Sequence, residues 1–321
     1  MKPATRMLIL ICGLVIVLAV LYFLRSAINP SGEASELQAA FDAEFLTRPD
    51  GYIGLQKHYG FGFRSEPKQM DPGLMYRAIA DGAVDVIDGF ATDGRIPAYD
   101  LVILEDDKEF FPPYYAAPVI RADTLKAHPG LAGLLGGLAG RISDRTMQRL
   151  NFEADEKGRK ASNIARRFLI EEGLLEEDAK QGKGSGGKIT VGSKHFTEQE
   201  ILGELMAILI EHKTDLAVQR KLNLGGTMIC FNALKAGDLD LYAEYTGTGL
   251  VNILNRDVIS DPDEAYGTVK TEFEDKYGLI WLEPLGFNNT YTLTMRAAHA
   301  RELGIETITD LAALIDRPGG K

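Results

Sequence analysis

Cysteine and histidine are scarce in this chain of 321 residues. The two cysteines are Cys12, inside an N-terminal apolar run, and Cys230, inside a segment with the pattern of a helix. We expect no disulfide between them, so the fold needs no oxidising compartment, although it tolerates one. The five histidines are scattered, and no pair has a metal-ligand spacing. The sequence therefore predicts neither a metal site nor a cofactor.

Positive charge is also in deficit. Lysine and arginine number 35 against 46 aspartates and glutamates, which leaves a net charge of −11. This balance argues against nucleic acid as a partner, because a nucleic-acid surface needs a basic face. No nucleophile–base pair and no phosphate-binding loop is recognisable, so the sequence names no catalytic residue. The length and the 45% hydrophobic content allow two globular domains with cores of their own.

A long hydrophobic run occupies residues 7–24. As a helix, its 18 residues would reach about 27 Å, close to the thickness of the bilayer's hydrocarbon core. Lys2 and Arg6 precede it, which favours an N-terminus inside and a body outside the cell. A cleaved signal peptide is the alternative, but its apolar region is usually shorter, and Arg25 follows where small residues belong. The run favours an uncleaved single-pass anchor in the cell membrane.

Two short stretches of the chain are similar and suggest a repeated unit. Residues 237–249 read GDLDLYAEYTGTG, and residues 82–94 read GAVDVIDGFATDG. Aligned without gaps, they place Gly82 on Gly237, Asp85 on Asp240 and Phe90 on Tyr245. Each predicts a strand that leads into a corner where free backbone N–H groups suit an anion and an aromatic ring suits a cation. One such corner alone fits an ordinary β–α turn with a core tyrosine, whereas two indicate α/β lobes that face each other across a cleft.

Strand and helix patterns alternate along the rest of the chain, which indicates an α/β fold with largely parallel sheets. Helices are predicted at 71–81, 227–236, 262–276 and 309–315, and helical periodicity extends over 123–175. Another helix is expected to start with Thr197 and Glu200 as its capping box. Residues 176–188, EEDAKQGKGSGGK, are polar and rich in glycine, so we expect a flexible linker there.

Several motifs resemble the substrate-binding proteins of osmoprotectant ABC importers, which bind glycine betaine, choline and related quaternary ammonium compounds. The motifs are GSKHFTEQ, NLGGTMICFNALKAGDLDLYAEYTGT, LGFNNTYTLTMR, EFLTRPDGY, ATDGRI and FFPPYYAAPVIR. The resemblance covers nearly all of the chain outside the anchor and the linker. It implies an α/β, two-lobed periplasmic-binding-protein-like (type II) fold with a cleft between the lobes, and a binding function.

The two halves of the chain stand in the reverse of the family's order. In the family, the part that resembles 189–321 comes first and the part that resembles 37–175 follows it, so this chain looks circularly permuted. An α/β fold tolerates this change when the joined ends are close. The resemblance implies an anchor and linker at 1–34, lobe 2 from 35–117 and 289–321, lobe 1 from 118–175 and 189–288, and a linker at 176–188.

The resemblance also implies the ligand-binding residues. The family surrounds the quaternary ammonium group, which has no N–H to donate, with aromatic rings from both lobes. The matching rings are Tyr245, Tyr114, Tyr291 and Phe90. Phe90 stands where a tyrosine is usual, which removes one hydroxyl. The positions that match the family's carboxylate-holding groups are Lys194, Arg48 and Thr248.

Other residues near these motifs are weaker candidates. Tyr115 is an alternative to Tyr114, and Asp93 and Gln199 flank the same corners. The run Glu105-Asp106-Asp107-Lys108 is expected to be a structural strand end rather than a catalytic acid pair.

The sequence thus predicts an extracytoplasmic, membrane-anchored solute-binding component of an ABC importer. Its expected partners are a quaternary ammonium ligand and the permease and ATPase subunits of the importer. Two other functions remain open. One is a membrane-anchored ligand sensor, and the other is an enzyme on the same two-lobed fold, since a fold does not determine a function.

Overall fold

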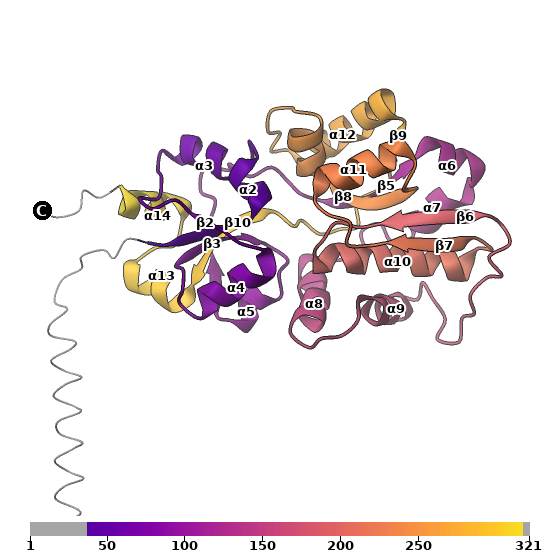
Figure 1. The fold of residues 1–321 in the computed structure, drawn as a ribbon, viewed down its shortest axis with the longest axis horizontal. Helices are drawn as coiled ribbons and strands as arrows, with labels where there is room; N and C mark the ends of the chain where they lie inside the picture. Colours follow the sequence, from indigo (N-terminus) through magenta and orange to yellow (C-terminus); the bar gives the residue numbers. More distant parts are fainter. Residues whose placement is uncertain (1–36, 317–321) are drawn as a thin grey trace, which may run out of the picture.

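Two five-stranded sheets form the protein (Figure 1). The structure is a computed structural model, and it describes residues 37–316. The sheets lie side by side as two lobes, each with helices on both faces (Figure 1). The anchor predicted at 7–24 lies outside the described residues. Within the described part of the chain, no helix is long and apolar enough to cross a membrane.

The sheet of lobe 2 has the strand order β2-β1-β3-β10-β4. Its strands are β1 (Ala39–Phe41), β2 (Lys68–Gln69), β3 (Val86–Phe90), β4 (Leu101–Ile103) and β10 (Tyr291–Arg296). Figure 1 shows α2 (Ala43–Thr47), α3 (Tyr52–Tyr59) and α14 (Ile308–Ile315) on one face, and α4 (Pro72–Ala80), α5 (Arg95–Ala98) and α13 (Ala297–Leu303) on the other. Because β10 pairs with β3 on one side and β4 on the other, the last segment of the described chain completes a sheet begun by the first.

The sheet of lobe 1 has the strand order β7-β6-β8-β5-β9. Its strands are β5 (Ala116–Arg121), β6 (Lys188–Gly192), β7 (Ala217–Lys221), β8 (Leu241–Tyr245) and β9 (Leu279–Trp281). The helices are α6 (Ala122–Ala127), α7 (Gly130–Gly136), α8 (Asp144–Asp155), α9 (Ala161–Glu171), α10 (Thr197–Lys213), α11 (Thr227–Ala236), α12 (Pro262–Tyr277) and the π-helix η1 (Thr248–Ile253). Helix α10 packs against the sheet and also against α8 and α9, which explains why it is buried on nearly every side.

Four strands of each sheet run in one direction and one strand is reversed. The reversed strands are β10 in lobe 2 and β5 in lobe 1. Each is the first strand after the chain crosses from the other lobe. A chain that enters at the cleft edge, where the parallel strands end, has to run away from the cleft. The expectation of largely parallel sheets is therefore confirmed, and the reversed strands mark the two crossings.

The crossings lie next to each other. Tyr115 and Asn288 form an antiparallel bridge, and the Tyr114 carbonyl accepts from the backbone N–H of Asn289 at 3.1 Å. Strand β5 starts at Ala116, so the lobe boundary expected between residues 117 and 118 falls inside a strand. Two rigid proline positions, Pro112 and Pro113, precede that strand on the first crossing.

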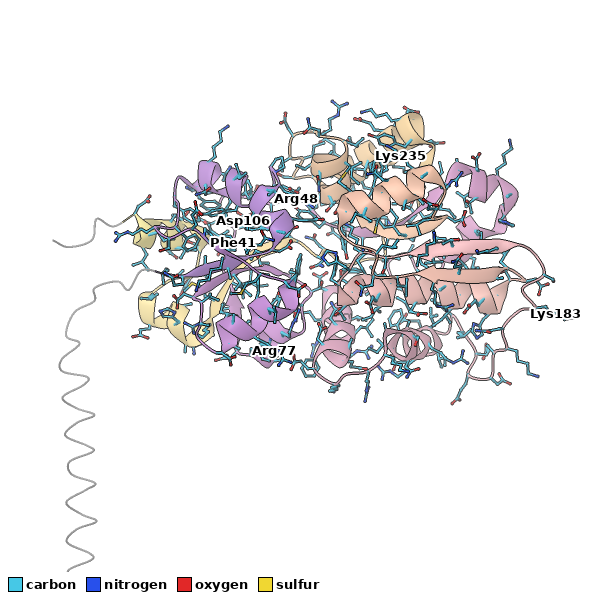
Figure 2. The ribbon with its side chains drawn as sticks, viewed as in Figure 1. Phe41, Arg48, Arg77, Asp106, Lys183 and Lys235 are labelled. Atoms are coloured by element: carbon cyan, nitrogen blue, oxygen red, sulfur yellow. The ribbon has the colours of Figure 1, made fainter. Side chains whose placement is uncertain are left out.

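One local prediction, the capping box at the start of α10, is wrong. The first residue of α10 is Thr197 and its cap is Phe196, whose side chain makes no capping bond. The Thr197 hydroxyl instead donates to Asp155 of α8 at 2.5 Å, so tertiary packing replaces the expected capping box. The segment 176–188 is irregular up to Gly187, but it is hydrogen-bonded to lobe 1. The backbone N–H of Gly182 donates to the Glu211 carbonyl, and that of Gly186 donates to the Asp215 carbonyl. It is attached along lobe 1, at the end far from lobe 2, where Lys183 lies (Figure 2).

Candidate functional site

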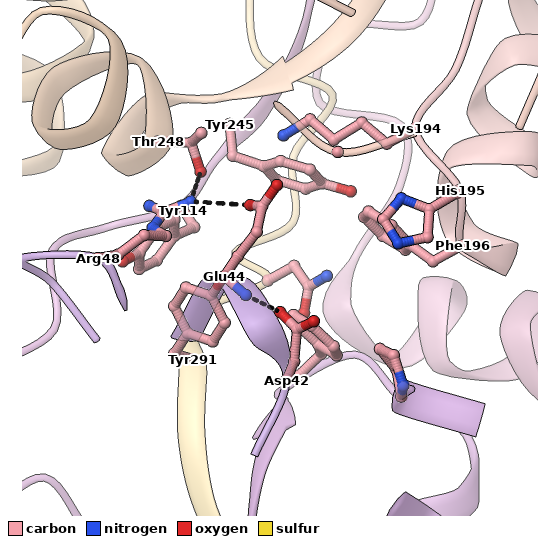
Figure 3. Close-up of a pocket in the computed structure, with 14 residues that line it drawn as sticks. Asp42, Glu44, Arg48, Tyr114, Lys194, His195, Phe196, Tyr245, Thr248 and Tyr291 are labelled. Atoms are coloured by element: carbon pink, nitrogen blue, oxygen red, sulfur yellow. Dashed lines mark hydrogen bonds and ion pairs between the residues drawn. The ribbon is translucent and has the colours of Figure 1, made fainter. Parts of the chain in front are cut away.

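A pocket with about 570 Å³ of empty space opens between the lobes, where the parallel strands of both sheets end. All seven predicted binding residues line it: Tyr245, Tyr291, Tyr114, Phe90, Lys194, Arg48 and Thr248. The pocket also contains residues that sequence reasoning missed: Asp42, Glu44, Pro72, His195, Phe196, Gly226 and Asn289. Figure 3 shows that the labelled side chains converge on this space from both lobes.

Five aromatic rings form a continuous arc along the pocket. Successive ring centroids are 5.5 Å apart from Tyr114 to Tyr291, 5.5 Å from Tyr291 to Phe90, 5.8 Å from Phe90 to Phe196, and 6.3 Å from Phe196 to Tyr245. Phe90 and Phe196 are nearly parallel, at 4°. The arc crosses the cleft, because Phe90 belongs to lobe 2 and Phe196 to lobe 1. Phe196 thus lies between two of the predicted rings and joins them.

Backbone register places two of these rings next to each other. Phe90 is the last residue of β3 and pairs directly with Tyr291, the first residue of β10. The Tyr76 hydroxyl also accepts from the backbone N–H of Phe90 at 3.0 Å. In lobe 1, Tyr245 ends β8, and the corner continues into the π-helix that starts at Thr248. The strand-to-helix corner predicted from the sequence is present, with wider helical turns than an α-helix has.

Two of the ring tyrosines donate to buried carboxylates. The Tyr245 hydroxyl lies 2.7 Å from Glu198, and the Tyr114 hydroxyl lies 2.6 Å from Asp50. Burial raises the pKa of both phenols well above the ordinary value, and the neighbouring carboxylates raise it further. A phenol bonded to an anion is polarised toward phenolate, which makes the ring face more attractive to a cation.

The two predicted cationic residues already have partners inside the protein. Arg48 donates to Asp50 from Nε at 2.8 Å and from Nη2 at 2.5 Å. Lys194 Nζ lies 2.5 Å from Glu244 and 3.0 Å from the Thr227 hydroxyl. Because Asp50 and Glu244 are fully buried, these pairs are fixed parts of the wall rather than exposed surface pairs.

Two carboxylates face the pocket from lobe 2. Burial alone would raise the pKa of Glu44, but Lys194, the Thr227 N–H and Arg48 outweigh it and hold the pKa below its ordinary value. Burial, together with the charge of Glu44, raises the pKa of Asp42. Neither residue was predicted, although Glu44 belongs to the motif EFLTRPDGY.

Hydrogen bonds join the lobes across the pocket. Glu44 accepts from the backbone N–H of Thr227, the first residue of α11, at 2.8 Å. Arg48 of lobe 2 donates to the Thr248 hydroxyl of lobe 1 at 3.3 Å (Figure 3). The lobes are therefore in contact across the pocket, and pocket-lining side chains of lobe 2 are held by lobe 1.

The weaker candidates lie outside this pocket. Tyr115 lines a separate cavity behind the crossings. Asp93 pairs with Arg95 at 2.5 Å, and Gln199 bonds the backbone of Lys194 and Ala243. Asp106 accepts from the Tyr59 hydroxyl at 2.5 Å and from the Phe111 N–H at 2.8 Å, which confirms the structural role expected for the acidic run. Among residues 37–316, no cluster of side chains is able to hold a metal ion.

This architecture defines a class of protein. Two α/β lobes, two crossings and a ligand-sized cleft between them are the features of a type II periplasmic binding protein. The family model described as the substrate-binding domain of ABC-type glycine betaine transport systems matches residues 27–171 and 187–321. The chain belongs to this family, whose members are binding proteins rather than enzymes.

Several known proteins are similar to parts of the chain. The carnitine transport binding protein of Listeria monocytogenes is 42% identical over 144 residues, which are 44% of this chain and 46% of that protein. A glycine-betaine-binding protein of Pseudomonas aeruginosa is 40% identical over 146 residues, 45% of this chain and 47% of its own length. A crystal structure of a glycine betaine/carnitine/choline ABC transporter protein is 40% identical, covers 44% of this chain and 52% of its own, and has a TM-score of 0.36. The aligned part of the chain thus spans about half the length of these relatives.

Proposed function

We propose that this protein captures a quaternary ammonium solute in the cleft and delivers it to the permease and ATPase subunits of an ABC importer. The observation that carries the proposal is the arc of five rings. Tetraalkylammonium ions have no N–H, so aromatic faces are the groups best able to recognise them, at about 0.5–2 kcal/mol per ring. The family supports the same class of ligand. Tyr114, Tyr291, Phe90, Phe196 and Tyr245 surround the ammonium in this proposal.

The polar end of the ligand faces Arg48, Lys194 and Thr248. Because the charges of Arg48 and Lys194 are balanced by Asp50 and Glu244, these two groups offer N–H donors rather than an uncompensated positive charge. With Asp42 and Glu44 included, two cations face four carboxylates. A net cation with a hydroxyl, such as choline, suits this balance better than a zwitterion, whose carboxylate adds another negative charge.

Calorimetric titration with choline, carnitine and glycine betaine tests the proposal. We expect choline to bind most tightly, and Tyr245→Ala and Tyr291→Ala each to weaken it by about 1–2 kcal/mol. Arg48→Ala removes a donor from the polar end and also leaves Asp50 without its cation, so both ligands should bind more weakly. The loss of the donor should make the effect larger for glycine betaine than for choline. Absence of binding for all three ligands, or full binding by Tyr245→Ala, would overturn the assignment.

The location of the protein and its chain order are part of the same proposal. We place the body on the extracytoplasmic side, held by residues 7–24 as a single-pass anchor. The chain is circularly permuted in this proposal, with 176–188 joining the ends that are free in the family. The match of the family model in two separate segments supports this order, as does the completion of the lobe 2 sheet by β10. Recovery of a mature protein that begins near Ser35 would contradict the anchor.

A further inference from the structure

Glu198, the second residue of α10, is buried between the lobes and has an unusual set of partners. Its side chain is fully enclosed, at 3% exposure. Among the described residues, no lysine, arginine or histidine forms an ion pair with it. Its charge is met instead by uncharged donors: Tyr245 Oη at 2.7 Å, Asn289 Nδ2 at 2.9 Å, Thr92 Oγ1 at 2.5 Å and Asn151 Nδ2 at 3.0 Å.

The donors divide between the two oxygens of the carboxylate. Oε1 accepts from Tyr245, which lies in the ligand pocket, and from Asn289 on the second crossing. Oε2 accepts from Thr92, which follows β3 in lobe 2, and from Asn151 of α8. One carboxylate therefore contacts a ring of the ligand pocket, a crossing and the opposite lobe.

The segment of lobe 2 around Thr92 has several further bonds to the same region. The backbone carbonyl of Thr92 accepts from Asn151 at 2.9 Å, and the backbone N–H of Thr92 donates to Asn289 at 3.3 Å. The neighbouring Ala91 carbonyl accepts from Gln148 of α8 at 2.9 Å. Thr92 does not line the ligand pocket, so any effect of its hydroxyl on ligand binding has to pass through Glu198 or the closure of the lobes.

We propose that Glu198 is a positioning residue that couples occupation of the aromatic pocket to closure of the lobes. It orients Tyr245 through one oxygen and holds Thr92 of the opposite lobe through the other. A buried carboxylate without a cation is tolerated only while its donors are complete. When the lobes separate, the Thr92 donor is lost. A ligand that packs on the Tyr245 ring fixes the hydroxyl and with it the carboxylate, ready to receive Thr92. This inference rests on the proposed ligand class for its ligand-bound test.

The decisive experiment is a double-mutant cycle on the full chain, with choline as the probe and the dissociation constant as the readout. Thr92→Val keeps the shape of the side chain and removes its hydroxyl, and Glu198→Gln removes the charge. Each should weaken choline about 10-fold, and the double variant should be little weaker than Glu198→Gln alone. Thr294→Val is the matched control, because this buried lobe 2 hydroxyl bonds Thr292 instead. Additive losses, or wild-type affinity in Thr92→Val, would overturn the coupling.

Hydrogen exchange gives an independent readout that does not need the ligand. The backbone amides of residues 89–95 should exchange faster in Thr92→Val and in Glu198→Gln. They should also exchange faster in Tyr245→Phe, because the hydroxyl that this variant lacks donates to Glu198, although it does not contact residues 89–95. Thr294→Val should leave their exchange unchanged. If wild-type protein does not bind choline, the proposed function fails, and this second readout still decides the inference. Unchanged exchange at 89–95 in Tyr245→Phe would show that Glu198 only stabilises the fold.

Discussion

Carboxylates outnumber cations in the interior around the cleft, and their charges are met in three different ways. Asp50 and Glu244 are paired with Arg48 and Lys194, while Glu198 is satisfied by neutral donors. Asp88 is a third case. It is fully buried, one of its oxygens accepts from the Asp42 N–H at 2.8 Å, and its other oxygen has no partner in the described structure. The cost of burying a charge therefore differs from site to site, which makes single substitutions informative.

Asp88→Asn should stabilise the protein at neutral pH. Burial, and then the charge of Asp42, raise the pKa of Asp88 well above its ordinary value. The contribution of the Asp88 carboxyl to the stability of the fold is therefore fully present below the unfolded pKa of about 4. It is lost as the pH rises through the folded pKa. Asparagine does not ionise, so the gain of about 1–2 kcal/mol should appear near pH 7 and fade toward pH 4. Thermal unfolding across pH measures it.

Asp310→Asn is the control of opposite sign for that experiment. Backbone N–H groups of Glu306 and Thr307 lower the pKa of Asp310, whose side chain completes a capping box at α14. Its contribution is present above the unfolded pKa and is lost as pH falls through the folded pKa. The variant should therefore be less stable than wild type near pH 7, and the two proteins should converge in acid. A loss of stability in Asp88→Asn near pH 7 would contradict the assignment.

Glu44→Gln should change the preference between ligands. It removes one negative charge from the pocket and leaves an acceptor for the Thr227 N–H. Choline should bind about 10-fold more weakly, whereas glycine betaine should lose less or gain affinity. The ratio of the two affinities, measured by calorimetry on the same sample, corrects for any general damage. An unchanged ratio would contradict the charge argument.

At the scale of elements, the two corners seen in the sequence are equivalent in space. Strands β3 and β8 occupy the same position in their sheets. Asp85 accepts from the Gln38 N–H at 3.0 Å, and Asp240 accepts from the Thr190 N–H at 2.7 Å, so both fasten the neighbouring strand. Gly82 and Gly237, which precede these strands, both have left-handed backbones, with φ of 74° and 84°.

The repeated turn predicts a matched pair of substitutions. Gly82→Ala and Gly237→Ala should each cost about 1–2 kcal/mol, because a Cβ disfavours the left-handed conformation. The two costs should be similar, because the Arg121 guanidinium, which the new Cβ of Gly237→Ala would approach to 2.2 Å, is the end of a flexible, partly exposed side chain and can move away. Gly267→Ala in α12 has open space and a helical backbone, so it should stabilise by about 0.5–1 kcal/mol. Urea unfolding measures all three, and an unaffected Gly82→Ala would refute the role of the turn.

At the scale of the whole molecule, the order of the chain and the order in space are largely independent. Lobe 2 is built from the two ends of the described chain, and both ends lie at that lobe in Figure 1. The connection 176–188 lies on lobe 1, away from the cleft (Figure 2). No residue of the pocket belongs to it. Cutting the chain within 176–188 and joining its present ends would change the chain order without altering any residue that lines the pocket.

A reordered chain tests this independence. Residues 187–321 followed by 35–175 give the order that we propose for the family, and we expect the same choline affinity and a similar melting temperature. Deletion of 290–321 from the natural order should instead remove β10 from between β3 and β4. Hydrogen exchange should then show loss of protection in lobe 2, including the strand that carries Phe90. Full protection of that strand after the deletion would contradict the observed topology.

Local sequence determined most of the elements of this protein. Periodicity and turn glycines placed α11 at 227–236 and the two equivalent corners, because these signals depend on neighbours within a few residues. Motif resemblance identified seven residues that the structure brings into one pocket. Their roles in binding stay predictions. Phe196 was missed, although it lies within the motif GSKHFTEQ, because nothing local shows which way a capping residue points.

Only the tertiary structure decided which charges pair and which residues join the lobes. Glu198 contacts Thr92, which is 106 positions away, and Arg48 contacts Thr248, which is 200 positions away. The same packing assigned Thr197 to Asp155 rather than to its own helix end. Local patterns report whether a side chain is buried, since burial repeats with the period of a helix or strand. They do not report its partner, because the partner is set by how helices and lobes that are distant in the sequence pack against each other.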